Sequence, residues 1–407
     1  MIQLTKNTLY GSRNQTVETR ALESWLRDNT QIPFSVLHLN IRSVNKNFEQ
    51  LEILLDGLYH NFSVIVLSET WIVGDTNLYN LPNYTTYYNY SKKNQNDGVI
   101  IYVHSSLPHY TETIKELNTN FLRVLVELKT QKIAVTGLYR SPNEKQEYFI
   151  SDLDQYINKH CLLKNEILIG DTNLNILQHN VNEIEEYKNI LAENGYIQLI
   201  SAPTRIFKTT VSLSQSCIDH IYMKTDLNFS HLNPLILNEQ ITDHYPIIMI
   251  LQNHQAANQH TERNQQHKRY VINKKLTQNL SKINWENTIN FSSTDDMNLK
   301  FEKFVHILKS EINSATIEIK HKSSNKKRKP WITNAIIASA NTKNRLYFES
   351  LKEPEIRHIY LEYKKELCKI IKERKKEYYS NKFRFIQTCD IKTFWKTTNE
   401  ILGKKRQ

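Results

Sequence analysis

The chain of 407 residues contains only four cysteines and lacks any long apolar run. The cysteines form no Cys-x-x-Cys pair and no metal-ligand spacing, which suits a reducing compartment and argues against a disulfide scaffold. No stretch approaches the roughly 18 apolar residues of a membrane span. Residues 1–30 lack the apolar core of a secretory signal peptide. We therefore expect an intracellular protein with no membrane association.

Charge of opposite sign is concentrated in the two parts of the chain. Residues 1–250 contain 20 Lys and Arg against 26 Asp and Glu, a net charge of −6. The whole chain carries +11, so residues 251–407 carry +17. This division indicates separate roles, and the basic part is the candidate for contact with a phosphate backbone.

Polar side chains follow several strand-like segments, at the point where each segment ends. Ile167 to Ile169 predict a buried strand, Gly170 permits a sharp turn, and Asp171 and Asn173 follow directly. Taken alone, an Asx-turn after an ordinary strand explains this pattern equally well. Five other strand-like segments end in polar groups of the same kind, which favours an active site. Together these residues are Asn40, Glu69, Tyr139, Asp171, Asn173, Asp219, Asp243 and His244.

These side-chain types suit the hydrolysis of a phosphodiester. That reaction needs a hard cation, a positioned water molecule and donors to the charge that develops on the phosphate. Carboxylates and an asparagine amide suit Mg²⁺, which prefers oxygen ligands. A histidine can donate to a phosphate oxygen while an aspartate holds its ring in the required tautomer. The set therefore predicts metal-assisted cleavage of a phosphoester.

In this order the residues resemble the endonuclease/exonuclease/phosphatase superfamily, and most closely the apurinic-type endonuclease domain of non-LTR retrotransposons. The likeness covers roughly residues 34–251. It is carried by Leu39-Asn40-Ile41-Arg42-Ser43, Ser68-Glu69-Thr70-Trp71, Leu138-Tyr139-Arg140-Ser141-Pro142, Pro203-Thr204-Arg205 and Thr242-Asp243-His244-Tyr245-Pro246. Most of residues 320–403 resemble the segment that joins endonuclease to reverse transcriptase in these elements. No Tyr/Phe-x-Asp-Asp pair follows residue 251, so we expect no reverse transcriptase part here.

Interleaved strands and helices predict mixed sheets covered by helices. The resemblance implies an α/β (α+β) fold, a four-layer sandwich of two mixed β-sheets flanked by helices, followed by a basic, mostly helical C-terminal region. The expected parts are an N-terminal lead segment (1–30), the endonuclease/exonuclease/phosphatase domain (31–251), a polar basic linker (252–330) and a basic helical segment (331–407). We expect the last segment to act as a partly mobile arm.

The resemblance also implies a metal site, with Mg²⁺ as the cofactor and Mn²⁺ as an alternative. Glu69 would bind the metal, and Asn40 and Asp243 would help to shape the site. One departure concerns Arg42, which stands where apurinic enzymes of the broader superfamily have a second acidic residue. Metal binding would therefore depend more strongly on Glu69.

The remaining roles are implied in the same way. Asp171 would orient or deprotonate the attacking water, and Asn173 would hold the water or the phosphate. Tyr139 and His244 would contact the scissile phosphate, and Asp219 would support His244. Arg140 and Arg205 are expected to contact the DNA backbone. We interpret His38 and His220 as structural.

The sequence thus predicts a Mg²⁺-dependent endonuclease that nicks DNA, as in target-site cleavage by non-LTR retrotransposons. Two alternatives stay open: a phosphatase of the same superfamily acting on small phosphoesters, and an inactive remnant that binds nucleic acid. DNA is the expected partner, with RNA as a second partner of the basic C-terminal region, and the nucleus is the expected location. The basic run from His321 to Lys329 is typical of a linker or a nuclear-import patch, with contact to nucleic acid as the next alternative.

Overall fold

The computed structural model describes residues 15–29, 32–72, 76–89, 96–112, 119–128, 131–208, 213–226, 231–252, 267–271, 273–289, 296–320, 329–387 and 390–401. The chain forms two compact units. The first comprises Met1–His254 together with Arg328–Gln407, and the second comprises Gln255–Lys327. The second unit is therefore inserted into the sequence of the first.

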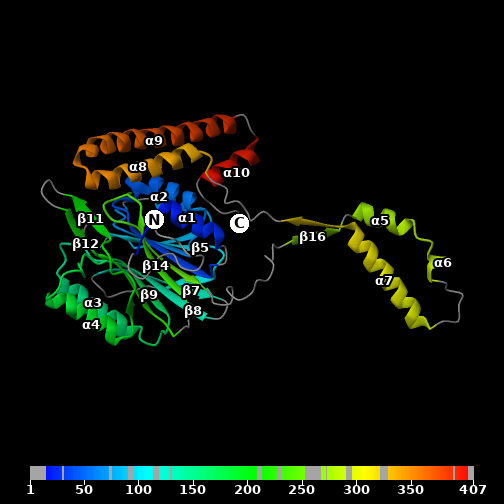
Figure 1. The fold of residues 1–407 in the computed structure, drawn as a ribbon, viewed down its shortest axis with the longest axis horizontal. Helices are drawn as coiled ribbons and strands as arrows, with labels where there is room; N and C mark the ends of the chain where they lie inside the picture. Colours follow the sequence, from blue (N-terminus) through cyan, green and yellow to red (C-terminus); the bar gives the residue numbers. More distant parts are fainter. Residues whose placement is uncertain are drawn as a thin grey trace. The chain divides into compact units, whose positions relative to one another are not determined.

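The first sheet of the larger unit has seven strands (Figure 1). In spatial order they are β1 (Thr16–Glu18), β14 (His231–Asn238), β15 (Ile247–Gln252), β2 (Phe34–Asn40), β3 (Val64–Ser68), β5 (Val99–His104) and β4 (Tyr84–Asn89). The pairs β1–β14 and β2–β3 are parallel and the others are antiparallel. The central strands β2 and β3 are buried along their whole length, as the continuous apolar run Val64 to Leu67 predicts for β3.

The second sheet has six strands. In spatial order they are β10 (Ile197–Gln198), β13 (Asp219–Lys224), β9 (Glu166–Asp171), β8 (Gln131–Tyr139), β7 (Asn120–Leu128) and β6 (His109–Glu112). Only β8 and β9 run parallel. A separate hairpin pairs β11 (Arg205–Lys208) with β12 (Leu213–Ser216). Both sheets are therefore mixed, as predicted.

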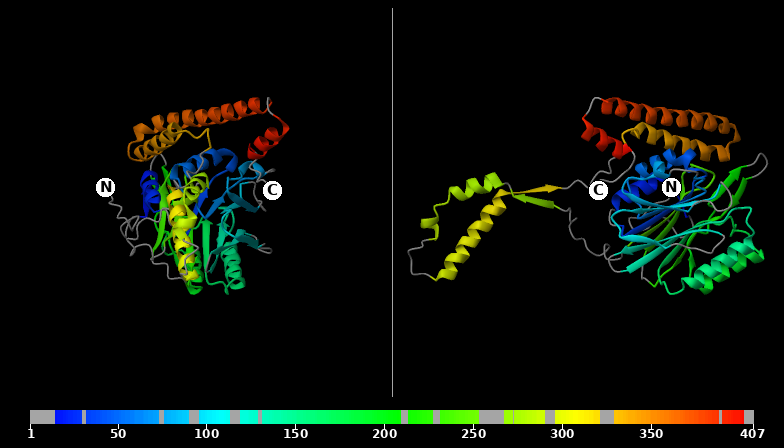
Figure 2. Two further views of the ribbon diagram at one scale, coloured as in Figure 1. Left: turned by 90° about the vertical axis from the view of Figure 1, so that its right-hand side faces the viewer. Right: turned by 180° about the vertical axis from the view of Figure 1, so that it is seen from behind.

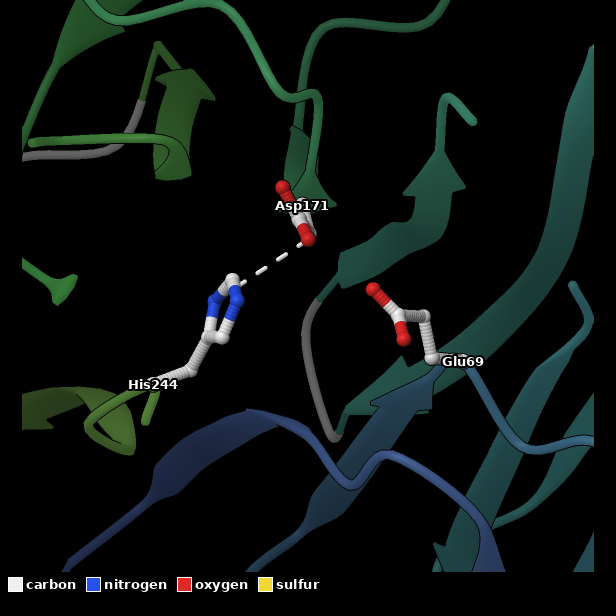
Figure 3. A group of neighbouring side chains, drawn as sticks. All are labelled: Glu69, Asp171 and His244. Atoms are coloured by element: carbon white, nitrogen blue, oxygen red, sulfur yellow. Dashed lines mark ion pairs between the residues drawn. The ribbon is translucent and has the colours of Figure 1, made fainter. Parts of the chain in front are cut away.

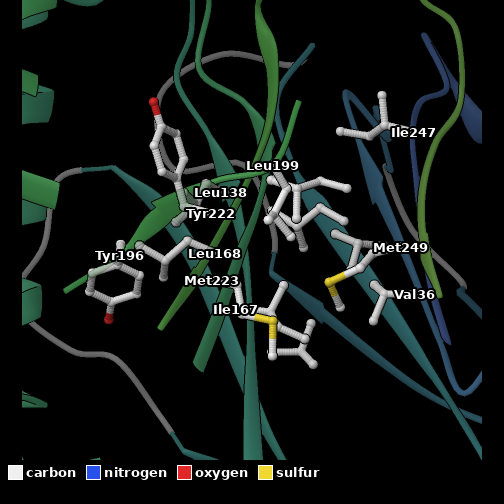
Figure 4. Close-up of a cluster of buried hydrophobic side chains, with 14 of the residues drawn as sticks. Val36, Leu138, Ile167, Leu168, Tyr196, Leu199, Tyr222, Met223, Ile247 and Met249 are labelled. Atoms are coloured by element: carbon white, nitrogen blue, oxygen red, sulfur yellow. The ribbon is translucent and has the colours of Figure 1, made fainter. Parts of the chain in front are cut away.

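The two sheets pack face to face over a shared apolar core. Figure 4 shows Val36 and Met249 of the first sheet beside Ile167 and Met223 of the second. The sheets approach closely at Gly137, because a Cβ atom there would lie 2.9 Å from both Val66 Cγ1 and Val99 Cγ1. Core side chains of this kind each contribute about 1.5–3 kcal/mol when they are fully buried.

Helices cover both outer faces, which completes four layers (Figures 1 and 2). The first sheet is covered by α1 (Thr19–Asp28) and α2 (Val44–Leu58), and the second by α3 (Gln146–Lys159) and α4 (Asn182–Glu193). A short 3-10 helix, η1 (Thr76–Tyr79), precedes β4. The fold class expected from the sequence is confirmed. Among the described residues, no helix is both long and apolar enough to cross a membrane.

The C-terminal helices belong to the same unit as the sandwich. They are α8 (Asn334–Lys352), the short η3 (Pro354–Ile356), α9 (Arg357–Gln387) and α10 (Ile391–Ile401). The hairpin of α8 and α9 packs on α2 through an apolar cluster that contains Ile53, Trp331 and Leu367. For α8 and α9 the expectation of a mobile arm is corrected here, because this cluster fixes both helices against the sandwich.

The second unit contains the antiparallel pair β16 (His267–Val271) and β17 (Thr316–Lys320). It also contains α5 (Asn273–Ser281), α6 (Trp285–Ile289) and α7 (Met297–Ala315). Trp285 of α6 contacts Phe304 of α7, with ring centroids 5.5 Å apart. The sequence indicated a linker here, whereas the described residues form folded elements. Residues 253–266, and the basic run from His321 up to residue 328, lie outside the described residues.

Candidate active site

The polar strand ends meet at one edge of the sandwich. Asn40 ends β2 and Glu69 directly follows β3, while Tyr139 and Asp171 end β8 and β9. Because β2–β3 and β8–β9 are parallel pairs, each pair brings its last side chains to the same edge. A cleft of 1090 Å³ opens there, and Glu69, Tyr139 and Asp243 are among the residues that line it.

An asparagine amide joins two carboxylates at the floor of this edge. Asn40 Nδ2 donates to Glu69 Oε1 at 2.8 Å and to Asp171 Oδ2 at 2.7 Å. Glu69 adopts the left-handed backbone region, with a φ of 48°, which an L-residue adopts at an energetic cost. Asn40 therefore acts here as a donor that positions both carboxylates, and its Oδ1 accepts from the backbone N–H of Arg42 at 3.2 Å.

Two aspartates lie side by side on neighbouring strands. Asp171 on β9 is paired in register with Asp219 on β13, and both side chains are fully buried. Burial and the charge of Asp219 raise the pKa of Asp171 to about 7. Because like charges in this position destabilise a sheet, the pair indicates a functional rather than a structural requirement.

The acidic side chains fit a divalent cation. Ligand atoms of Glu69, Asp171 and His244 all lie within 4.8 Å of one another, and Figure 3 shows the three side chains directed toward a common space. Carboxylate oxygens are the donors that Mg²⁺ prefers, and a cation would offset the repulsion that raises the pKa of Asp171. Asp171, predicted to orient or deprotonate the attacking water, thus belongs to the same group as the predicted metal residue Glu69.

A second aspartate orients the histidine. His244 Nδ1 lies 2.9 Å from Asp219 Oδ2, and Thr204 Oγ1 donates to the same oxygen at 2.7 Å. Burial alone would lower the pKa of His244, but the negative charges of Asp219 and Asp171 raise it to about 9. The ring is therefore protonated near neutral pH, and its Nε2–H is the group that can donate to a substrate.

Two arginines hold Asp243. Arg42 Nη1 lies 2.7 Å from Asp243 Oδ1, and Arg205 Nε donates to Asp243 Oδ2 at 2.7 Å. Burial raises the pKa of Asp243, but His244 and the two guanidinium groups lower it below its usual value. Both carboxylate oxygens thus have partners, which makes Asp243 an anchor for the arginines. Its expected part in shaping the metal site is indirect in this arrangement.

Arg140 is not available to DNA, contrary to the expectation from the sequence. Its side chain is 3% exposed, and its guanidinium donates to the backbone carbonyls of Thr172, Asn173, Ser141 and Glu144. Asn173 in turn donates from Nδ2 to the Arg140 carbonyl at 2.8 Å, and its backbone N–H donates to Asp171 Oδ1 at 2.9 Å. Arg140 and Asn173 therefore stabilise the turn that positions Asp171.

Sequence reasoning did not identify one wall of the cleft. Lys364, Cys368 and Lys372 of α9 line it, although they follow the sandwich by more than a hundred residues. Trp71 and Phe207 also line it. The i, i+4 spacing of Lys364, Cys368 and Lys372 is visible in the sequence, but it gives no indication of what the stripe faces. His38 and His220 occupy buried positions, in contact with Ser68 Oγ and Tyr187 Oη respectively.

Comparison with known proteins gives similar solved structures only. No protein-family model matches the chain, and no curated protein matches it. The endonuclease domain of TRAS1, a telomere-specific non-LTR retrotransposon, is 15% identical over 55% of this chain and 100% of its own, with a TM-score of 0.45. TDP2 of D. rerio, complexed with a single-strand DNA product, is 16% identical over 54% of this chain and 99% of its own, with a TM-score of 0.41. An AP endonuclease from Archaeoglobus fulgidus is 15% identical over 54% of this chain and 100% of its own, also with a TM-score of 0.41.

Proposed function

We propose that this chain is a metal-dependent phosphodiesterase that nicks DNA, as the sequence resemblance to retrotransposon endonucleases implies. One observation carries the proposal. Asn40 donates to both Glu69, which lines the open cleft, and Asp171, and these two carboxylates lie beside the buried His244–Asp219 pair. A cation-binding carboxylate, a base and a protonated donor within one site are the groups that phosphodiester hydrolysis requires.

Each group has a role that follows from its surroundings. His244, held by Asp219 through Nδ1, would donate from Nε2 to a non-bridging oxygen of the scissile phosphate. Tyr139 lines the cleft, and burial together with the charges of Glu69 and Asp171 raises its pKa, so its hydroxyl stays a neutral donor. Asp171 accepts a hydrogen bond from the Asn173 backbone, which fixes the carboxylate that would orient and deprotonate the attacking water.

Glu69, with Asp171 beside it, would hold the cation, for which Mg²⁺ is the ion that best matches oxygen ligands. A bound divalent cation supplies charge stabilisation to the phosphate and to the leaving oxygen. Asn40 donates one hydrogen bond to each carboxylate, which helps to hold both in position. Arg205, whose side chain is partly exposed beside Asp243, would contact the DNA backbone.

The test is nicking of supercoiled plasmid by the full chain with Mg²⁺ and with EDTA. We expect open-circular product only with Mg²⁺, and none from Glu69→Gln or Asp171→Asn, since each replacement keeps side-chain size but removes a charge. Glu193→Gln, which removes an exposed carboxylate from α4, is the matched control and should nick as wild type does. Circular dichroism checks that each variant is folded. A wild-type chain that leaves the plasmid supercoiled with Mg²⁺, or a Glu69→Gln variant as active as wild type, rules the proposal out.

A further inference from the structure

Helix α9 contributes a row of side chains to the cleft. Lys364, Cys368 and Lys372 lie four residues apart and therefore form one stripe along the helix. Two further basic residues line the cleft: Lys46 in the first turn of α2, and Arg42, which precedes that helix and pairs with Asp243. The floor, by contrast, carries Glu69, Asp97 and Asp243. The cleft thus has an acidic floor and a basic rim that is formed by two helices.

The stripe is held in a fixed position beside the loop that contains Gln240 and His244. Tyr360 Oη donates to Gln240 Oε1 at 2.6 Å, the Gln240 backbone N–H donates to Asn344 Oδ1 at 3.2 Å, and Lys343 Nζ donates to the Gln240 carbonyl. Gln240 lies only four residues before His244. On the other side of the hairpin, Lys375 donates to Glu49 of α2 at 2.6 Å. The lysines of the stripe are therefore presented on a docked helix.

The stripe carries positive charge without a matching partner. In the part of the chain that the structure describes, neither Lys364 nor Lys372 forms an ion pair. Lys364 Nζ donates a hydrogen bond to the neutral Gln240 Oε1 at 3.4 Å. Burial lowers the pKa of Lys364, and the nearby charges of Lys343 and Lys46 lower it further, whereas Cys368 and Asp243 raise it. An anionic ligand would relieve the repulsion between these lysines.

We propose that α9 binds the sugar–phosphate backbone of the DNA strand in the cleft, with Lys364 and Lys372 contacting phosphates on one side of the cleavage point. This rests on the proposed function. Eight residues of helix span about 12 Å at 1.5 Å per residue. That length corresponds to about three or four nucleotides at a rise of 3.4 Å per step, so the two lysines reach different phosphates of one strand. The C-terminal hairpin is then a part of the substrate site.

The first test measures binding of a fluorescent DNA duplex by the full chain in EDTA, where no cleavage occurs. Lys372→Glu is compared with Lys369→Glu, an exposed lysine of the same helix that does not line the cleft. Both variants change the net charge equally. We expect Lys372→Glu to weaken binding roughly fivefold to tenfold at low salt and to reduce the slope of log Kd against log salt by about one. Lys369→Glu should differ from wild type by less than about twofold.

The second test does not alter charge. Cys368 lies between the two lysines, so bound DNA should slow its alkylation several-fold in a chain with Cys161→Ser and Cys389→Ser. Equal binding by the two lysine variants, or an alkylation rate of Cys368 that DNA leaves unchanged, overturns the inference. The two proposals fail separately. Protection of Cys368 without plasmid nicking would contradict the proposed nuclease activity but support the DNA-binding surface on α9. Nicking without protection of Cys368 would contradict the DNA-binding surface alone.

Discussion

Arg42 donates from Nη1 to Oδ1 of Asp243 over 2.7 Å, and its Nε lies 3.8 Å from Glu69 Oε2. A fixed positive charge therefore lies beside two carboxylates that the sequence associates with a metal. A guanidinium in this place competes electrostatically with a divalent cation, because both are attracted to the same oxygens.

Replacing Arg42 by Gln should therefore strengthen cation binding. We expect the Mg²⁺ concentration for half-maximal nicking to fall about threefold to tenfold, because the positive charge of Arg42 no longer offsets the attraction between the cation and the carboxylates. Lys46→Gln removes an equal charge from the rim without touching either carboxylate, and it serves as the control. A higher Mg²⁺ requirement in Arg42→Gln would show that the guanidinium supports the metal site.

Asp219 and His244 should differ in importance. His244→Ala removes the donor itself, and we expect kcat to fall about 10²- to 10⁴-fold. Asp219→Asn keeps a partner at Nδ1 but loses the charge that orients and protonates the ring, so a milder loss of about 10- to 100-fold is expected. Steady-state kinetics on an oligonucleotide duplex measure both. A larger loss for Asp219→Asn would assign Asp219 a direct contact with substrate.

Arg140 should matter for stability and Arg205 for DNA. Arg140→Gln leaves buried carbonyls of Thr172 and Asn173 without donors, which costs about 1–3 kcal/mol for each group. Urea denaturation should report a correspondingly lower free energy of unfolding. Arg205→Gln, at a partly exposed side chain, should leave unfolding nearly unchanged and weaken DNA binding. The reverse pattern would restore Arg140 as a DNA contact.

Two tryptophans test the docking of the C-terminal hairpin. Trp331 is 2% exposed in the cluster with Ile53, whereas Trp395 of α10 is 58% exposed. Trp331→Ala should lower the free energy of unfolding by about 3–5 kcal/mol. It should also raise KM for DNA, because α9 then leaves the cleft. Trp395→Ala should change neither quantity, and equal effects of the two replacements would contradict the docked arrangement.

Buried His220 should make the fold sensitive to acid. Burial lowers its pKa to about 4, from an ordinary value of 6.5. The unfolded chain therefore takes up a proton between pH 6.5 and 4 that the folded chain does not, so stability is present above pH 6.5 and is lost as pH falls toward 4. The loss amounts to roughly 2–3 kcal/mol. In His220→Gln the unfolding free energy should fall less over this range, as urea titrations at pH 7 and pH 4 would measure.

The sequence allowed prediction of the sandwich and its site because both depend on local patterns. Continuous apolar strands such as Ile167 to Ile169, each followed by a carboxylate, place Asp171 and Glu69 at strand ends whatever the surroundings are. The role of Arg140 was not predictable, because it depends on carbonyls of Thr172 and Glu144 that reach the guanidinium only after folding. The sequence predicted a basic helical segment over 331–407 but could not show that Ile53 of α2 lies against it.

The packing of α9 on α2 also determines the order in which parts of this unit can form during synthesis. The last strand of the sandwich contains Leu251, and about 120 further residues must be added before Ile371 reaches α2. At about 5–20 residues per second, this takes roughly 6 to 24 s. During that interval the nascent chain can form both sheets of the sandwich, and with them the acidic floor of the cleft, while Ile53 is still exposed to water. A ribosome-bound chain would therefore present an apolar surface to chaperones, and the cleft would gain the lysines of α9 only after that helix has been synthesised.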